Sequence, residues 1–188
     1  MATLNYVPPY VPVPPSDGGD EGPRRLPPGT ERIGMLLLLA AISMMFIGLT
    51  SAYIVSEAFG PVWDQLTVYP LVWVNTAVLL FSSCSMELAR RRNSLPWLLA
   101  TLVSGLIFLA GQIAVFGLLA RHGFYLSSGR QASFYYVLTA LHGVHLLGGI
   151  AALAWAVFRR RTAKLGVIAI YWHFMDALWL YLLLVIFL

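Results

Sequence analysis

"GVIAIYWHFMDALWLYLLLVIFL", residues 166–188, is an apolar run that carries a histidine and a carboxylate near its middle. About 20 apolar residues in a helix cross the ~30 Å hydrocarbon core of a bilayer. A helix is favoured because a segment in lipid must satisfy its own backbone hydrogen bonds. Polar side chains at such depth are costly, so His173 and Asp176 each need a structural or functional reason to be there.

The composition of the whole chain also indicates a protein of the lipid bilayer. Its 188 residues are 59% hydrophobic and 11% charged, whereas soluble domains contain about 25% charged residues. The single cysteine, Cys84, excludes a disulfide framework, and we expect it to be a small packing residue among its apolar neighbours. The sequence therefore predicts an all-α polytopic membrane protein with five spans, at about residues 33–55, 68–89, 96–120, 133–158 and 166–188.

Residues 1–32 differ from the rest, because eight of the eleven prolines fall there. No apolar run follows a basic start, so a signal peptide is not expected. The segment is predicted to be a disordered, solvated tail, and docking of the tail on a partner subunit is the alternative.

Basic residues are unevenly divided between the two sides of the predicted spans. Arg121 and Arg130 lie on one side. The other side holds ten: Arg24, Arg25, Arg32, Arg90, Arg91, Arg92, Arg159, Arg160, Arg161 and Lys164. The positive-inside rule then predicts a cytoplasmic N-terminus and an outside, periplasmic C-terminus. The net charge of +4 thus reflects topology, and no nucleic-acid partner is expected.

Polar side chains in four of the spans fall in one central band. Its members are Asn75, Gln112, His142, His145, His173 and Asp176. At ~1.5 Å rise per residue, His173 lies roughly 10 Å and Asp176 roughly 15 Å from the cytoplasmic edge. His145 lies at roughly 20 Å by the same measure, so the antiparallel fourth and fifth spans can bring it close to Asp176.

We expect this band to be a structural polar network that fixes the fourth span against the fifth, because ionisable groups inside membranes usually pair with one another. His142 and His145 share one helix face at i, i+3, as do His173 and Asp176. A metal site that uses His142, His145 and His173 is an alternative, and proton conduction is another. A bis-histidine haem is disfavoured, because His145 and His173 differ by roughly 10 Å in depth.

Two other groups have simpler interpretations. Glu87 lies about one turn from the cytoplasmic end of its span and is predicted to pair with Arg90 or Arg91. Three tryptophans deep in the spans are assigned either to helix contacts or to lipid-facing grooves: Trp155, Trp172 and Trp179.

Three motifs resemble those of the haem-copper oxidase subunit III family. "YWHFMDALW" (171–179) is similar to "YWHFVDxVW" in the last helix of that family. "LHGVHLLGG" (141–149) resembles "FHGLHVxxG" in the preceding helix, and "NTAVLLFSS" (75–83) resembles "NTSVLLxSG". "RIGMLLLLAAISMMFIGLTSAY" (32–53) fits the helix with which the short bacterial forms begin. The resemblance covers about residues 31–188.

The resemblance implies a five-helix, non-catalytic subunit III of a respiratory terminal oxidase in a bacterial inner membrane. Such a subunit would stabilise the catalytic subunit I and support its proton and oxygen supply during aerobic electron transport. No cofactor is expected in this chain; haem and copper would be in partner subunits, and phospholipid could bind. A supercomplex is a further possible partner. Subunits of quinol oxidases or nitric oxide reductases remain alternatives.

One position departs from the family pattern. Many members carry a membrane-embedded glutamate in a pattern like "SEVxFF", and the aligned stretch here is "SMMFI", with Met44 in its place. Any role built on that charge cannot be carried over to this chain.

Overall fold

The computed structural model describes residues 29–57, 69–121, 123, 130–159 and 165–187. Over these residues the chain forms five α-helices and no strand, which confirms the predicted fold class. The helices are α1 (Thr30–Glu57), α2 (Tyr69–Arg92), α3 (Leu95–Arg121), α4 (Arg130–Phe158) and α5 (Leu165–Phe187). Each is long and apolar enough to cross a membrane.

Four of the five predicted spans are shorter than the helices because they were bounded by hydropathy, and the fifth, 166–188, is shifted by one residue from α5. Charged residues such as Arg32, Arg92 and Arg121 continue the helices past the apolar runs, where a helix end can reach the headgroup region. Most of the predicted tail, residues 1–28, lies outside the described residues, as do Arg160, Arg161 and Lys164 of the fourth connection.

Capping interactions set several helix ends. The carbonyl oxygen of Gly29 accepts hydrogen bonds from the amides of Arg32 (3.0 Å) and Ile33 (3.1 Å), which starts α1. Asn93 has a φ of 47°, and the amide of Ser94 donates to the carbonyl of Ala89 at 3.3 Å. This pair is a Schellman ending, and it lets Asn93 and Ser94 alone connect α2 to α3.

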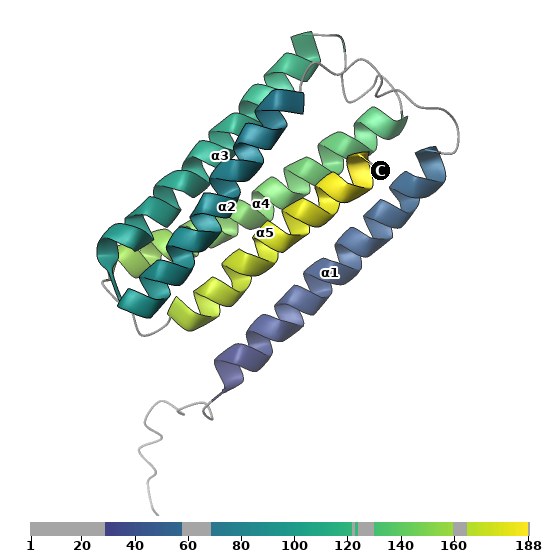
Figure 1. Ribbon diagram of the computed structural model, residues 1–188. Helices are drawn as coiled ribbons and strands as arrows, with labels where there is room; N and C mark the ends of the chain where they lie inside the picture. Colours follow the sequence, from purple (N-terminus) through teal and green to yellow (C-terminus); the bar gives the residue numbers. More distant parts are fainter. Residues whose placement is uncertain (1–28, 58–68, 122, 124–129, 160–164, 188) are drawn as a thin grey trace, which may run out of the picture.

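Four of the helices form a closed ring and the fifth lies outside it. Helix α2 packs against α3, α3 against α4, α4 against α5, and α5 against α2. Helix α1 packs on the outer side of α4 and α5 (Figure 1). The start of α1, the α2–α3 connection and the start of α5 lie at one end of the molecule, and the C-terminus lies at the other.

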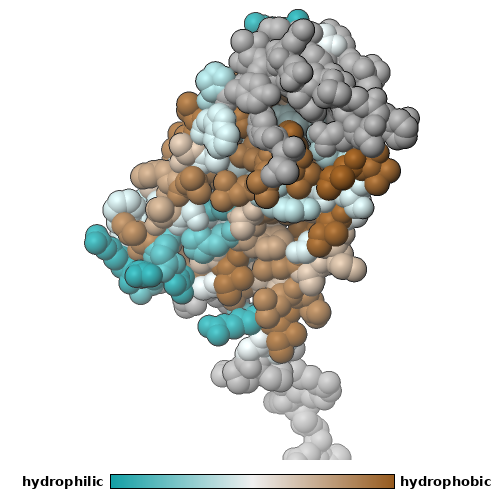
Figure 2. Space-filling view, turned by 45° about the vertical axis from the view of Figure 1, so that its right-hand side comes forward, coloured by the Kyte–Doolittle hydropathy of each residue, from teal (hydrophilic) through white to brown (hydrophobic). Residues whose placement is uncertain are grey.

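Exposed apolar side chains cover the middle of the molecule. Figure 2 shows hydrophobic residues across the centre of the visible face and hydrophilic residues gathered toward one end. Large exposed apolar side chains occur on all five helices, among them Leu37, Phe81, Ile113, Val144 and Leu184. This surface suits a lipid solvent. Cys84 is also exposed, so its assignment as a packing residue was wrong.

Glycines let the ring close around one tryptophan of α5. Trp172 has no exposed surface. An added Cβ at Gly105 of α3 would lie 2.8 Å from its ring, and one at Gly149 of α4 would lie 3.2 Å from it. Small residues thus bring the helix backbones together, as is common between helices in membranes.

We predict that Gly105→Ala destabilises the bundle by about 1–3 kcal/mol, because the new methyl group overpacks Trp172. Gly117→Ala on the same helix is the matched control, since nothing lies within 4 Å of its added Cβ. It should be neutral or slightly stabilising, because alanine favours a helix over glycine. Thermal unfolding in detergent, followed by circular dichroism, compares the two. Equal midpoints for both variants would contradict this account of the packing.

Candidate functional site

The motif 171–179 attaches α5 to α2 through its two tryptophans. The indole Nε1 of Trp172 donates to Ser82 Oγ at 3.2 Å, and that of Trp179 donates to Thr76 Oγ1 at 3.1 Å. Both indoles are buried, and a spacing of seven residues places them on one face of α5. Of the two sequence assignments, helix contacts therefore apply to these residues, whereas Trp155 has 44% of its surface exposed.

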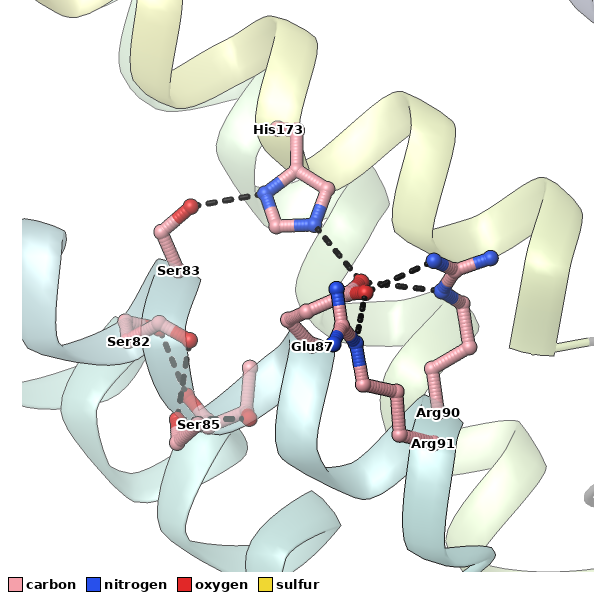
Figure 3. Close-up of polar contacts among 8 residues, drawn as sticks. Ser82, Ser83, Ser85, Glu87, Arg90, Arg91 and His173 are labelled. Carbon is pink, nitrogen blue, oxygen red and sulfur yellow. Dashed lines mark hydrogen bonds and ion pairs between the residues drawn. The ribbon is translucent and has the colours of Figure 1, made fainter.

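A third contact between α2 and α5 uses His173. Its Nδ1 lies 2.7 Å from Ser83 Oγ, and its Nε2 lies 3.8 Å from Glu87 Oε2. His173 thus points to α2 (Figure 3) rather than to the histidines of α4. With the two indoles, it connects the segments 75–83 and 171–179 of the antiparallel helices α2 and α5 through three contacts.

Glu87 is surrounded by cationic groups at the end of α2. Arg90 donates to its carboxylate from Nε (2.9 Å) and from Nη2 (2.7 Å), and Arg91 donates from Nε at 2.6 Å. All four side chains, including His173, converge in Figure 3. These are partly exposed groups, so in water their pairing would contribute little to stability. Here it neutralises a carboxylate close to the hydrocarbon region.

Among the described residues, no hydrogen bond joins any two of the five remaining residues of the central band, and two of them, Asn75 and His145, contact backbone carbonyl groups instead. Asn75 donates from Nδ2 to the carbonyl of Phe108 on α3 at 3.1 Å. His145 Nδ1 lies 2.8 Å from the carbonyl oxygen of Leu141 in its own helix, and its ring meets Phe46 of α1 edge-on at 5.9 Å. The contact from α5 to α4 instead comes from Tyr171, whose hydroxyl donates to the carbonyl of His145 at 2.7 Å.

Three band residues are buried without a hydrogen bond among the described residues: Gln112, His142 and Asp176. The His142 ring packs against Trp179, with ring centroids 5.2 Å apart, and edge-on against Phe108 at 6.1 Å. Asp176 lies one turn of α5 beyond His173, which contacts Ser83 Oγ, and no hydrogen bond among the described residues joins Ser83 to the Asp176 carboxyl group. No hydrogen bond among the described residues connects any two members of the predicted band.

Hydroxyl side chains between α2 and α3 were missed in the sequence. Ser85 Oγ lies 2.8 Å from Thr101 Oγ1 and also donates to the Ser82 carbonyl at 2.8 Å. Ser82 Oγ donates to the Thr101 carbonyl at 3.3 Å. A serine or threonine in a predicted span gives little indication of a contact between helices, because its hydroxyl can donate a hydrogen bond to a backbone carbonyl of its own helix. The available signal was their grouping in residues 82–85.

The three histidines of the alternative metal site point to different neighbours. His142 faces α3 and α5, His145 faces α1, and His173 faces α2. Within the residues that the structure describes, no group of three His, Cys, Asp or Glu side chains lies together as a metal site requires. His122 lies outside those residues.

Comparison with known proteins identifies the family. Residues 28–188 match the family described as Cytochrome c oxidase subunit III. The chain belongs to this family. Its relatives include a cytochrome c oxidase subunit 3 from Synechocystis sp., 32% identical over 86% of this chain and 76% of that protein. A probable cytochrome c oxidase subunit 3 from Nocardia farcinica is 31% identical over 81% of this chain and 85% of that protein.

Membership in the cytochrome c oxidase subunit III family confirms the resemblance of the sequence motifs. A third relative, a probable cytochrome c oxidase subunit 3 from Mycobacterium leprae, is 32% identical over 85% of this chain and 88% of that protein. The chain is therefore a subunit III of a haem-copper oxidase, in a multi-pass membrane location. Met44 has 74% of its surface exposed on α1, so a carboxylate at this position would lie on the outer surface of the bundle.

We predict that the hydrogen bond between Trp172 and Ser82 can be measured in a double-mutant cycle of Trp172→Phe and Ser82→Ala. The coupling free energy should be about 0.6 kcal/mol, the average for such bonds in membranes, and at most ~1.7 kcal/mol. A second cycle of Trp172→Phe with Thr76→Ala is the control, because Thr76 bonds to Trp179 instead. Its effects should add. Equal coupling in both cycles would argue against a specific bond.

Proposed function

We propose that this chain is a non-catalytic subunit that contacts the catalytic subunit I of a cytochrome c oxidase, stabilises it during turnover and supports its supply of protons and oxygen. The observation that carries the proposal is that three residues of the motif 171–179 contact another helix of the same chain. Trp172, His173 and Trp179 are occupied by contacts with α2 inside the chain. A motif used in this way builds a scaffold for a partner, and haem and copper would be held by the other subunits.

The printed names of the relatives favour cytochrome c oxidase over the alternatives. The relatives from Synechocystis sp., Nocardia farcinica and Mycobacterium leprae are all named as subunits of that enzyme. A quinol oxidase or nitric oxide reductase has no comparable support. The divergent directions of His142, His145 and His173 weigh against a metal enzyme built on them.

A groove between α1 and α5 supports a lipid partner. Its volume is about 260 Å³, it is open to the surface, and it is lined by Ser43, Phe46, Ile47, Phe174, Ala177, Leu178 and Tyr181. An almost entirely apolar lining at membrane depth suits one acyl chain of a phospholipid. The Pro-rich tail and the outer face of α1 are the proposed contacts for a larger respiratory assembly.

The distribution of arginines between the two ends of the bundle supports a cytoplasmic N-terminus in a bacterial inner membrane. Arg32, Arg92 and Arg159 lie at the start of α1, the end of α2 and the end of α4, which share one end of the bundle (Figure 1). Arg121 ends α3 at the opposite end. The positive-inside rule assigns the arginine-rich end to the cytoplasm.

Purification of the complex through a tag on this chain should recover the catalytic subunit with its haem and copper, identified by mass spectrometry and elemental analysis. Oxidase from cells that lack the chain should begin at a similar rate but lose activity after fewer turnovers. The same strain complemented with the chain is the control. Stoichiometric metal retained by the isolated chain, or recovery without an oxidase subunit, would overturn the proposal.

A matched pair of cysteine variants tests the orientation. Arg92→Cys and Arg121→Cys are introduced separately in a Cys84→Ser background, and both positions are exposed at opposite ends of the bundle. A membrane-impermeant maleimide added to spheroplasts should label the variant at 121 but not the one at 92. Both should be labelled after lysis. The reverse pattern would contradict the proposed orientation.

A further inference from the structure

Asp176 carries a buried carboxyl group. Among the described residues it is the only buried carboxyl group whose two oxygens lack a hydrogen-bond partner. The residue is 4% exposed, and neither oxygen has a hydrogen bond among the described residues. An ionised carboxylate in apolar surroundings costs far more free energy than the neutral acid. The neutral, protonated form of a buried carboxyl group without a cation is therefore favoured.

Each helix that packs around α5 contributes different groups at this level. The register of α4 against α5 follows from two contacts, Gly149 with Trp172 and His142 with Trp179. It places Asp176 level with His145, whose ring is directed to Phe46 of α1. Helix α3 contributes the uncharged Gln112 near the level of Trp179. Helix α1 carries its charged residues at its ends.

A series of neighbouring polar groups leads from Asp176 along the interface of α2 and α5, and one hydrogen bond joins two of its members. Asp176 follows His173 by three residues and therefore shares its face of α5, and the Ser83 hydroxyl lies 2.7 Å from His173 Nδ1. The other ring nitrogen, Nε2, lies 3.8 Å from Glu87 Oε2. A small side-chain rotation would bring that separation within hydrogen-bond range. Figure 3 shows the imidazole between Ser83 and Glu87, with one nitrogen toward each.

This series reaches the aqueous surface at the arginine end. Glu87 is five residues from Arg92, the last residue of α2, which is roughly 8 Å along the helix. Its carboxylate is already held by Arg90 and Arg91. The side chain of His173 is 39% exposed, so its imidazole is accessible from the surface of the subunit. Such a placement is unusual for an ionisable group within a span and marks a functional position.

We propose that Asp176 is a proton-binding site that exchanges protons with the aqueous phase at the arginine end of α2, through His173 and Ser83. A proton arriving beside Glu87 binds Nε2, and Nδ1 releases its proton to the Ser83 oxygen. Ser83 passes its own hydrogen to the Asp176 carboxylate. One proton enters, one is bound at Asp176, and rotation of the imidazole restores the starting tautomer.

The described contacts connect this site to one surface only. Toward the opposite end of the bundle, His142 and Gln112 near the level of Trp179 have no hydrogen bond among the described residues. Asp176 is therefore a proton store with access from one side, and not one step of a channel across the membrane. The proposal does not depend on which oxidase the chain joins.

Infrared spectroscopy of the full chain in lipid nanodiscs tests the store directly. A protonated carboxyl group gives a carbonyl band that shifts on transfer to D₂O, and a ¹³C label on the aspartate side chain separates it from glutamate bands. At neutral pH the labelled band should be present in the natural chain and absent in Asp176→Asn. In Ser83→Ala and in His173→Leu it should persist, with deuterium exchange slowed by about tenfold or more.

Matched variants exclude a general effect on the fold. Ser43→Ala removes a hydroxyl that donates to Leu39 of its own helix, and His145→Leu removes a ring bonded to Leu141; exchange should be unchanged in both. If Asp176→Asn does not fold, replacing the other aspartates, Asp17, Asp20 and Asp64, by asparagine leaves Asp176 as the sole labelled residue. The proposal would be overturned if the natural chain lacked the band of the protonated carboxyl group. It would also be overturned if Ser83→Ala and His173→Leu exchanged deuterium as fast as the natural chain.

Discussion

The burial of two indoles from one face of α5 is the interaction on which the rest of the bundle depends. In lipid, apolar contact alone does not distinguish a helix neighbour from an acyl chain, so association needs close packing and hydrogen bonds. Trp172 and Trp179 supply both. Each indole is buried inside the ring of four helices, and each donates a hydrogen bond to a hydroxyl of α2. The glycines of α3 and α4 then follow, because only they leave room for the Trp172 ring.

The fold class was predictable because hydrocarbon thickness imposes one length on every span. The five apolar runs and the family motifs gave the helices and the family before any contact was known. Depth was also informative: the register of α4 and α5 places Asp176 level with His145, within the separation expected from the rise per residue. Helix ends were less predictable, since charged residues extend a helix without adding to its hydropathy.

Contacts between the helices could not be obtained from depth alone. Residues at one height can face any of several neighbours, and nearly uniform apolar runs give little indication of which face is inside. His173 was expected opposite α4 and instead meets Ser83 of α2. Cys84, one residue further along the same helix, is exposed. The rotation of each helix is decided by large side chains and glycines, so it becomes visible only when all the partners are placed.

The position of α1 outside the ring has a consequence for synthesis. This helix is made before α2 and α3, yet its neighbours α4 and α5 are made after them. It is therefore made before either of the helices on which it packs. Its polar side chains suit that interval: Ser43 donates to the carbonyl of Leu39 at 2.8 Å and Thr50 to that of Phe46 at 2.9 Å, both within α1. Only afterwards does the Thr50 hydroxyl meet Tyr181 of α5, at 2.9 Å. The hydroxyl groups of Ser43 and Thr50 therefore have hydrogen-bond acceptors within α1 before α4 and α5 are made.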